Sequence, residues 1–404
     1  MKPDLLFLCH RIPFPPDKGD KIRAFHILKH LQRTFRVHLG CFYDDPSDEC
    51  HIPMLRREVA SLNCLPIPST LTKFRALSRV RPGKPLSVSY YQSKYMDRWI
   101  QTVTKHTDIA QVFVFSSTMA PYAELLPKVP KLLDMVDVDS EKFSSYGKNS
   151  KFPFNLVWSR EGRTLLNFER SLIGRFDCTI FASPAEKLRF DALAPESVDN
   201  TDWVTNGVDT AYFSPELRFT SPFDSKPAIV FTGTMDYRPN IEAVLWFSKH
   251  VLPAFGQHKE RPVFYIVGAN PSPEVQELAV QNNVVVTGKV TDVRPYLAHA
   301  SVSVAPLRIA RGIQNKVLEA MAMARPVVVS TEALTGIDAT PGYDLIVADN
   351  AGDMVKAIND VLDLKHGQLG RNARRTIYES YSWPAALSRL DEMLTKPRIT
   401  EAVL

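Results

Sequence analysis

The 404 residues, of which 45% are hydrophobic, 10% aromatic and 23% charged, are typical of a globular protein and too many for one ordinary hydrophobic core, so we expect two domains. A formal net charge of +5 suits an anionic small ligand or a negatively charged membrane face, and it is too small to indicate a nucleic-acid-binding protein. The five cysteines form no C-x-x-C pair, which argues against a disulfide framework or a metal site and favours a reducing cytoplasm.

The amino-terminal segment resembles a secretory signal only superficially. Its apolar core, residues 5–9, is shorter than the roughly 7–15 residues of a signal sequence, and no small-residue cleavage site follows. No apolar run approaches the ~20 residues of a membrane-spanning helix. We therefore expect this segment to be a buried first strand of a soluble, cytoplasmic protein.

Short apolar runs rich in β-formers alternate with longer amphipathic stretches along the whole chain, which predicts βαβ units, mostly parallel sheets and an α/β fold class. In the first half we predict strands at 4–10, 37–43, 109–116, 131–136 and 176–182, and helices at 19–34, 93–106, 154–175 and 184–192. In the second half we predict strands at 228–233, 262–267, 283–287, 301–306, 326–330 and 344–348, and helices at 239–253, 272–281, 292–299, 315–324 and 351–363.

The segment 210–227 is polar, rich in proline and without periodicity, which predicts the boundary between the domains. We place the domains at 1–212 and 213–384. Two sheets joined by one linker create a cleft, and open α/β sheets bind ligands at the carboxyl ends of their strands. The expected site is therefore this cleft.

The loop after the first predicted strand carries three cations and a glycine. Gly19 lies between the strand and the following helix, and Lys18, Lys21 and Arg23 surround it. The cations suit the phosphates of a ligand or an anionic acceptor. The alternative is the solvated start of an amphipathic helix.

An acidic cluster ends the strand predicted at 131–136. Asp134, Asp137 and Asp139 have a spacing that suggests a metal site. We prefer polar groups on the acceptor side, where Asp137 or Asp139 could orient or deprotonate an acceptor hydroxyl.

Two further stretches of the first half differ in character. Residues 72–91 are basic and partly apolar, so they could lie against anionic lipid or form a solvated basic face. The aromatic residues of 155–172 recur at helical spacing, and we expect them in the core.

Glycines end two predicted strands in the second half. Gly233, followed by Thr234 in the run TGTMDYRPN, permits a tight turn close to a ligand, and Gly268 lies at the end of another strand beside the same expected crevice. Arg238 in the same run could clamp a phosphate with two hydrogen bonds. An ordinary strand-to-helix turn is the alternative.

The strongest pattern is the strand, loop, helix and strand of residues 301–330. The loop 307–314 leads into a helix N-terminus, which favours anions, and Gly312 would let the backbone approach a phosphate. Lys316 lies in the first helical turn, where it opposes the helix dipole unless an anion is bound. Glu319, one turn on, could accept hydrogen bonds from a ribose diol; a solvated Lys–Glu pair is the alternative.

The run GIQNKVLEAMAMARPVV (312–328) resembles the carboxyl-terminal signature of the group 1 (family 4) glycosyltransferases, which have the GT-B fold. More narrowly, the chain is similar to the sugar transferases of bacterial exosortase and exopolysaccharide gene clusters. The resemblance implies two Rossmann-like domains whose parallel sheets face a central cleft. It implies an acceptor-side domain at 1–212, completed by a last helix at about 385–404, and a donor-binding domain at 213–384.

The resemblance also assigns residues to a nucleotide-sugar donor. It implies that Glu319 holds the ribose, that Gly312 and Lys316 contact the diphosphate, and that Ile313 belongs to the same donor-binding loop. By the same resemblance, Gly19 and Arg23 face the donor from the first domain, Arg238 joins Lys316 in neutralising the diphosphate, and the backbone at Val290 pairs with the base. The family usually has a glutamate where this chain has Arg311, which bears on the identity of the donor sugar.

The resemblance implies transfer of a sugar from a UDP- or GDP-sugar to a saccharide or lipid-linked acceptor in bacterial exopolysaccharide biosynthesis. It further implies a retaining outcome, no metal, no cofactor besides the nucleotide sugar, and possible peripheral contact with the cytoplasmic membrane face. Two alternatives remain open: a nucleotide-sugar 2-epimerase of the same fold, and a non-catalytic sugar-nucleotide-binding protein, motivated by Arg311. A NAD-dependent oxidoreductase is disfavoured because no G-x-G-x-x-G follows the first strand of either half.

Overall fold

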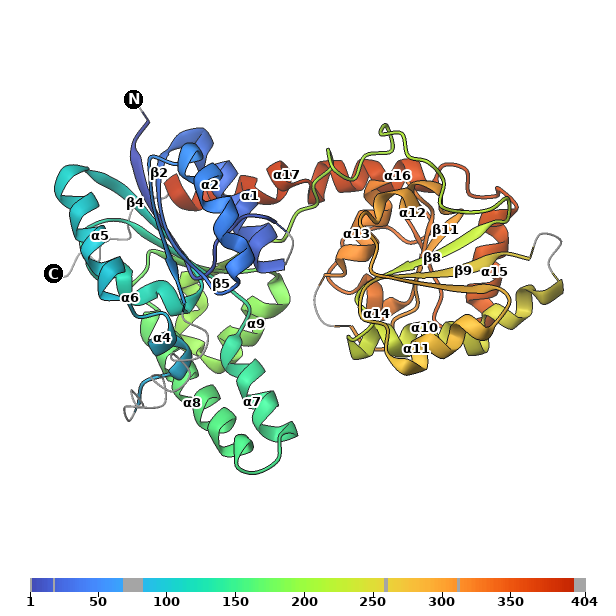
Figure 1. Ribbon diagram of the computed structural model, residues 1–404, viewed down its shortest axis with the longest axis horizontal. Coiled ribbons are helices and arrows are strands. Elements are labelled where there is room, and N and C mark those ends of the chain that lie inside the picture. Colours follow the sequence, from blue (N-terminus) through green and yellow to red (C-terminus); the bar gives the residue numbers. More distant parts are fainter. Residues whose placement is uncertain (1, 17–18, 68–82, 258–260, 311–312, 396–404) are drawn as a thin grey trace. The chain divides into compact units, whose positions relative to one another are not determined.

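A computed structural model describes residues 2–16, 19–67, 83–257, 261–310 and 313–395, and these form two compact units (Figure 1). Unit 1 comprises Met1–Asn206 and Leu387–Leu404, and unit 2 comprises Gly207–Ala386. The break lies a few residues before the boundary predicted at 212/213. The reason is that Val208 pairs with Ser382 and donates its N–H to the carbonyl of Tyr381, so the chain after Asn206 packs within unit 2.

The core of unit 1 is a parallel sheet of seven strands in the order β3-β2-β1-β4-β5-β6-β7. Its central strands are buried on both faces, as β1 shows with exposures of 0–1% from Leu5 to Cys9. The strands are β1 Asp4–Cys9, β2 Arg36–Tyr43, β3 Ser61–Pro66, β4 Ile109–Phe115, β5 Lys131–Val136, β6 Cys178–Phe181 and β7 Thr201–Trp203. The α-helices are α1 Gly19–Thr34, α2 Ile52–Glu58, α4 Leu86–Tyr90, α5 Lys94–His106, α6 Ala120–Ala123, α7 Asp139–Asn149, α8 Phe154–Leu172 and α9 Pro184–Leu193.

The core of unit 2 is a parallel sheet of six strands in the order β10-β9-β8-β11-β12-β13. The strands are β8 Ala228–Thr232, β9 Val263–Val267, β10 Val284–Gly288, β11 Val302–Ala305, β12 Val327–Val329 and β13 Ile346–Val347. The α-helices are α10 Arg238–His250, α11 Pro273–Glu277, α12 Arg294–His299, α13 Asn315–Ala322, α14 Thr331–Leu334, α15 Ala351–Leu362 and α16 Leu369–Thr376, and α17 Trp383–Thr395 crosses the border between the units.

The predicted α/β class with parallel sheets is confirmed. Several elements of unit 1 were not predicted, among them the short helices α2, α4 and α6, the strand β3 and the helix α7. The edge strand β3 is only part-buried and contains polar residues, so it has no continuous apolar run. The helix α7 is polar, and it forms through its packing on α8, where Gly147 and Gly162 let the two helices approach closely.

The aromatic residues of 155–172 are part-buried. Phe168 packs against the core of unit 1, as expected, whereas Trp158 stacks on Phe143 of α7, with ring centroids 5.6 Å apart. The aliphatic side chains of Leu156 and Val157, in the first turn of α8, are 61% and 38% exposed. None of the described helices is both long and apolar enough to cross a membrane.

The carboxyl ends of β8 and β9 approach each other so closely that they require two glycines. A Cβ atom on Gly268 would lie 1.7 Å from the carbonyl oxygen of Gly233, and both residues have positive φ angles, 159° and 154°. The backbone amide of Gly233 donates to the carbonyl of Val267 at 3.0 Å, which holds the two strand ends together. Side chains at these positions are therefore excluded by space as well as by backbone conformation.

We predict that Gly268→Ala destabilises unit 2 by about 3 kcal/mol or more, because no rotation relieves a clash between Cβ and backbone. Urea unfolding followed by circular dichroism measures the change. Gly256→Ala is the matched control, since its Cβ would meet nothing within 4 Å, and it should change stability by less than about 1 kcal/mol. Equal stability of the two variants would contradict the close approach.

Candidate active site

The chain order of the strands in unit 2 reverses between β8 and β11, and this switch point positions the candidate site. Helices that follow the strands on either side of a switch point leave on opposite faces, which opens a crevice at the carboxyl ends. The turn after β8 contains Gly233 and Thr234, and the loop after β11 leads into α13 with Lys316 as its second residue. The predicted donor residues of two distant segments therefore meet at one edge of the sheet.

Lys316 is the cation at this edge. Its ammonium group hydrogen-bonds to the side-chain oxygen of Asn240 and lies 4.7 Å from the centre of the Phe231 ring. The site of a Cβ on Gly233 is only 3.3 Å from the same nitrogen, so the glycine makes room for the lysine. Burial lowers the pKa of Lys316 to about 8, and the charge of Glu319 acts in the opposite direction.

Asn240 joins the two segments, and sequence reasoning missed it. Its side chain is 4% exposed; its amide nitrogen donates to the carbonyl of Thr234 at 2.8 Å, and its oxygen accepts from Lys316. One amide thus fixes both the turn after β8 and the lysine of α13. The signal in the sequence was a polar residue at the start of the helix that follows the strand-end glycine, in the run TGTMDYRPN.

Glu319 lies one turn after Lys316 on α13 and is part-buried. Burial raises its pKa to about 7, while the nearby ammonium of Lys316 lowers it. Among the described residues no side chain donates a hydrogen bond to this carboxylate. The pair therefore offers one cation and one hydrogen-bond acceptor beside a helix N-terminus, which suits a ligand carrying both phosphates and hydroxyls.

Three other predicted donor residues make contacts with neighbouring residues of unit 2. The side chain of Arg238 is 68% exposed and pairs with Glu242 at 2.7 Å, which is the ordinary i, i+4 contact of a helix. Val290 is part-buried after the end of β10 and packs against the core. Ile313 packs near Gly336, whose Cβ would lie 3.3 Å from it. Arg311 and Gly312 lie outside the described residues.

Arg23, predicted at a ligand-facing loop, is instead built into the interior of unit 1. Its side chain is 1% exposed, and its Nε donates to Asp134 at 2.8 Å. One Nη donates to the carbonyl of Val204 and to the side chain of Asn206 at 2.8 and 3.0 Å. The other has no hydrogen-bond partner within the described ranges. A pairing between α1 and the buried end of β5 is thus the role that the structure gives this cation.

Two more predicted residues of unit 1, Gly19 and Asp137, are exposed. Gly19 is the exposed first residue of α1, and a Cβ there would meet nothing within 4 Å. Asp137 follows β5 and reaches the surface, and its pKa is raised by desolvation and by the negative charges of Glu186 and Asp139. In the part of the chain that the structure describes, no group of three His, Cys, Asp or Glu side chains is arranged to hold a metal ion.

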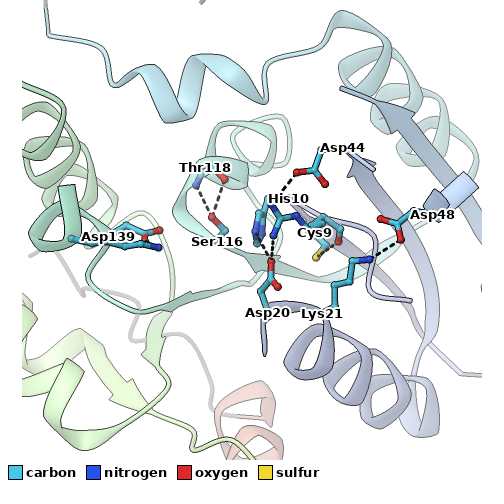
Figure 2. Close-up of polar contacts among 11 residues, drawn as sticks. Cys9, His10, Asp20, Lys21, Asp44, Asp48, Ser116, Thr118 and Asp139 are labelled. Atoms are coloured by element: carbon cyan, nitrogen blue, oxygen red, sulfur yellow. Dashed lines mark hydrogen bonds and ion pairs between the residues drawn. The ribbon is translucent and has the colours of Figure 1, made fainter. Parts of the chain in front are cut away.

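Unit 1 has its own switch point between β1 and β4, and His10 lies there (Figure 2). The His10 ring stacks on Phe115 with centroids 5.8 Å apart, and its Nε2 lies 3.5 Å from the carboxylate of Asp20. Ser116, with a φ of 80°, follows β4 and shares a hydrogen bond of 2.8 Å with the Thr118 hydroxyl. Figure 2 shows His10 between Asp20 on one side and Ser116 with Thr118 on the other.

The neighbours of Asp20 favour the ionised form of its carboxyl group. Burial alone would raise the pKa of Asp20, but hydrogen bonding to His10 and the positive charge of Arg11, at 2.7 Å, outweigh it and lower that pKa. A lone histidine after a strand carries no motif, so no role for His10 was predicted from the sequence. Its position next to the switch point is the signal that could have found it.

Residues 226–363 match the family model described as glycosyl transferases group 1. No curated protein sequence matches the chain. Among solved structures, HepE of Anabaena in complex with UDP and glucose has a TM-score of 0.61 at 14% identity, covering 97% of this chain and 99% of that one. Sucrose-phosphate synthase of Thermosynechococcus elongatus has a TM-score of 0.64 at 17% identity, covering 97% and 98%.

A third similar structure is S. aureus TarM, solved as a variant with fondaparinux, alpha-GlcNAc-glycerol and UDP, with a TM-score of 0.62 at 12% identity and coverage of 98% and 100%. At these identities the structures establish the fold alone. The chain therefore has the GT-B fold of glycosyltransferases, and residues 226–363, which include the Lys316 site, match the group 1 glycosyl transferase model.

The pKa of Glu319 generates a prediction about stability. Because folding raises this pKa from 4.5 to about 7, the folded state loses stability as pH rises between these values, and the loss is complete above about pH 7. The Glu319→Gln variant cannot ionise. We predict that it gains stability over the wild type across pH 4.5–7 and that the difference is constant above.

Urea unfolding at intervals between pH 4 and 8 measures this difference. Glu332→Gln, on the nearby short helix α14, is the control and should show no comparable dependence, since its side chain is exposed. A Glu319→Gln advantage that shrinks as pH rises would show that the carboxylate is stabilised, not penalised, by its surroundings.

Proposed function

We propose that this protein transfers a sugar from a UDP-sugar to a saccharide acceptor. The observation that carries the proposal is the arrangement of Lys316, Asn240 and Glu319 at the switch point of unit 2. The titles of the similar structures support the choice of UDP, because HepE was solved with UDP-glucose and TarM with UDP. A GDP-sugar remains the alternative donor.

The donor half follows from the charges on α13. Lys316 and the first amides of α13 neutralise the diphosphate as the glycosidic bond to it breaks, and Glu319 accepts hydrogen bonds from the ribose hydroxyls. Asn240 holds the lysine in place, so little reorganisation is needed when the donor binds. The acceptor oxygen bonds to the anomeric carbon as the bond from that carbon to the diphosphate breaks, the acceptor proton passes to a base on the acceptor side or to the departing phosphate oxygen, and UDP is released.

The acceptor half is proposed for unit 1. His10 carries a buried Nδ1 without a hydrogen-bond partner among the described residues, and its Nε2 faces an ionised Asp20. An imidazole held in this way can hydrogen-bond to an acceptor hydroxyl or accept its proton. Asp137 is a second candidate for this role. The proposal includes a retaining outcome, independence from metals, a lipid-linked acceptor, a place in exopolysaccharide biosynthesis and peripheral contact with the cytoplasmic membrane face.

The donor site is tested by a thermal-shift screen of UDP-, GDP-, ADP- and CMP-sugars, with and without EDTA. A ligand at 100 times its Kd stabilises the folded state by about 2.7 kcal/mol. We expect UDP-sugars to raise the Tm of the wild type in the presence of EDTA. Lys316→Ala and Glu319→Ala should lose most of this shift, and Asn240→Ala should lose part of it.

Lys289→Ala is the matched control, because this lysine lies in unit 2 and is exposed. Its response should equal that of the wild type. Absence of a shift from every sugar nucleotide would remove the transferase proposal. Conversion of the free sugar nucleotide without an acceptor would instead favour the 2-epimerase, and binding without turnover on any acceptor would favour a non-catalytic binding protein.

The acceptor site is tested by steady-state kinetics of His10→Ala. We predict that kcat/KM for the acceptor falls about tenfold or more, because a hydrogen bond to the reacting hydroxyl is lost. The donor Kd should stay within twofold, as calorimetry would show, since Lys316, Asn240 and Glu319 are unchanged. His106→Ala is the control at the end of α5. A loss of donor affinity, or unchanged kinetics, would contradict the assignment of His10 to the acceptor.

A further inference from the structure

The tip of the α7–α8 hairpin exposes a group of large apolar side chains. Figure 1 shows the two helices extending together from the sheet of unit 1. Around the turn between them, apolar side chains are exposed to an unusual degree: Phe152 at 78%, Phe154 at 63%, Leu156 at 61%, Tyr146 at 45% and Val157 at 38%. We call these five residues the apolar tip. Large exposed apolar side chains gathered around one turn of the chain are a candidate interaction surface.

The apolar tip is not needed to hold the hairpin together. The inner faces of the helices are joined by Phe143 and Trp158, whose rings stack at 15°, and by two glycines. A Cβ on Gly147 would lie 2.4 Å from the Ser159 hydroxyl oxygen, and one on Gly162 would lie 2.9 Å from the carbonyl oxygen of Ser140. The helix pair is therefore closely packed and presents the outward side chains from a rigid support.

The charges around the apolar tip are all of one sign. From residue 142 to residue 160 the chain contains Lys142, Lys148, Lys151 and Arg160 and neither Asp nor Glu. Lys148 and Lys151, closest to the turn, are exposed. Aromatic and aliphatic side chains combined with lysines are the composition of segments that lie in the interface of anionic bilayers. The long lysine side chains can keep their charges at the headgroups while the apolar groups enter the layer below.

We propose that the apolar tip inserts into the headgroup region of an anionic lipid bilayer, with Lys148 and Lys151 binding the phosphates. A second copy of the chain fits less well, because a two-fold interface through this tip would set lysines against lysines. This proposal assigns the membrane contact of the proposed function to particular residues, and its biological role rests on that function. Vesicle binding itself requires no donor and no turnover, so the two can fail separately.

The test is flotation of the full chain with anionic vesicles of phosphatidylethanolamine containing about 30% phosphatidylglycerol. Vesicles of phosphatidylcholine alone are the comparison. We expect the wild type to bind the anionic vesicles and to be released by high salt, because salt screens the lysines. Phe152→Ser combined with Phe154→Ser and Leu156→Ser should weaken binding at least about tenfold. Lys148→Glu combined with Lys151→Glu should weaken it by a similar factor.

Tyr95→Ser combined with Leu188→Ser is the matched control, since both residues are at least as exposed as most of the tip, at 71% and 66%, and lie elsewhere in unit 1. It should bind as the wild type does. Failure of the wild type to bind anionic vesicles, or equal loss in the control, overturns the proposal. A dimer in light scattering that the serine variant dissociates, without vesicle binding, would assign the tip to self-association instead. A normal Tm shift with UDP-sugars in the serine variant would show that the donor site is intact.

Discussion

The parallel arrangement of each sheet is the constraint on which the site depends. When all strands run the same way, every carboxyl end lies at one edge, and the order of the strands reverses once, at β1/β4 in unit 1 and at β8/β11 in unit 2. Helices must leave on opposite faces there, so the backbone opens at that point. Gly268 lets the ends of β8 and β9 approach each other, and Gly233 leaves room for Lys316, because a Cβ there would lie 3.3 Å from the lysine nitrogen.

The same edge concentrates charges that are unfavourable for folding. Lys316 and Glu319 are both held where burial opposes their ionisation, with pKa values shifted to about 8 and about 7. Shifts of this kind at a strand edge are characteristic of functional sites, since a ligand can provide the interactions that the free protein lacks. Asn240 limits the loss by hydrogen-bonding to Lys316 and to the turn after β8. One side-chain amide therefore links the turn after β8 to the lysine of α13.

Two arginines that a pattern assigns to a ligand make contacts within the protein instead. Arg23 donates hydrogen bonds to the buried Asp134 carboxylate and to the carbonyl of Val204, so it holds α1 against the sheet. Removing either partner of such a pair leaves an uncompensated buried charge, so the Arg23–Asp134 pair has a structural role. Arg238 takes the opposite course and is exposed beside Glu242. In both cases the partner that decided the outcome lies outside the motif from which the role was inferred.

The sequence by itself determined the α/β class, most of the strands and the candidate donor helix, because apolar periodicity and strand-end glycines are local properties of the chain. It also singled out Lys316 and Glu319, since their spacing on one helix follows from sequence alone. Only the tertiary structure brought Asn240 to Lys316, placed His10 at a switch point, buried Arg23 and left the apolar tip of α7–α8 exposed. These outcomes depend on which distant segments meet, and that is set by strand order and helix packing, which no local pattern encodes.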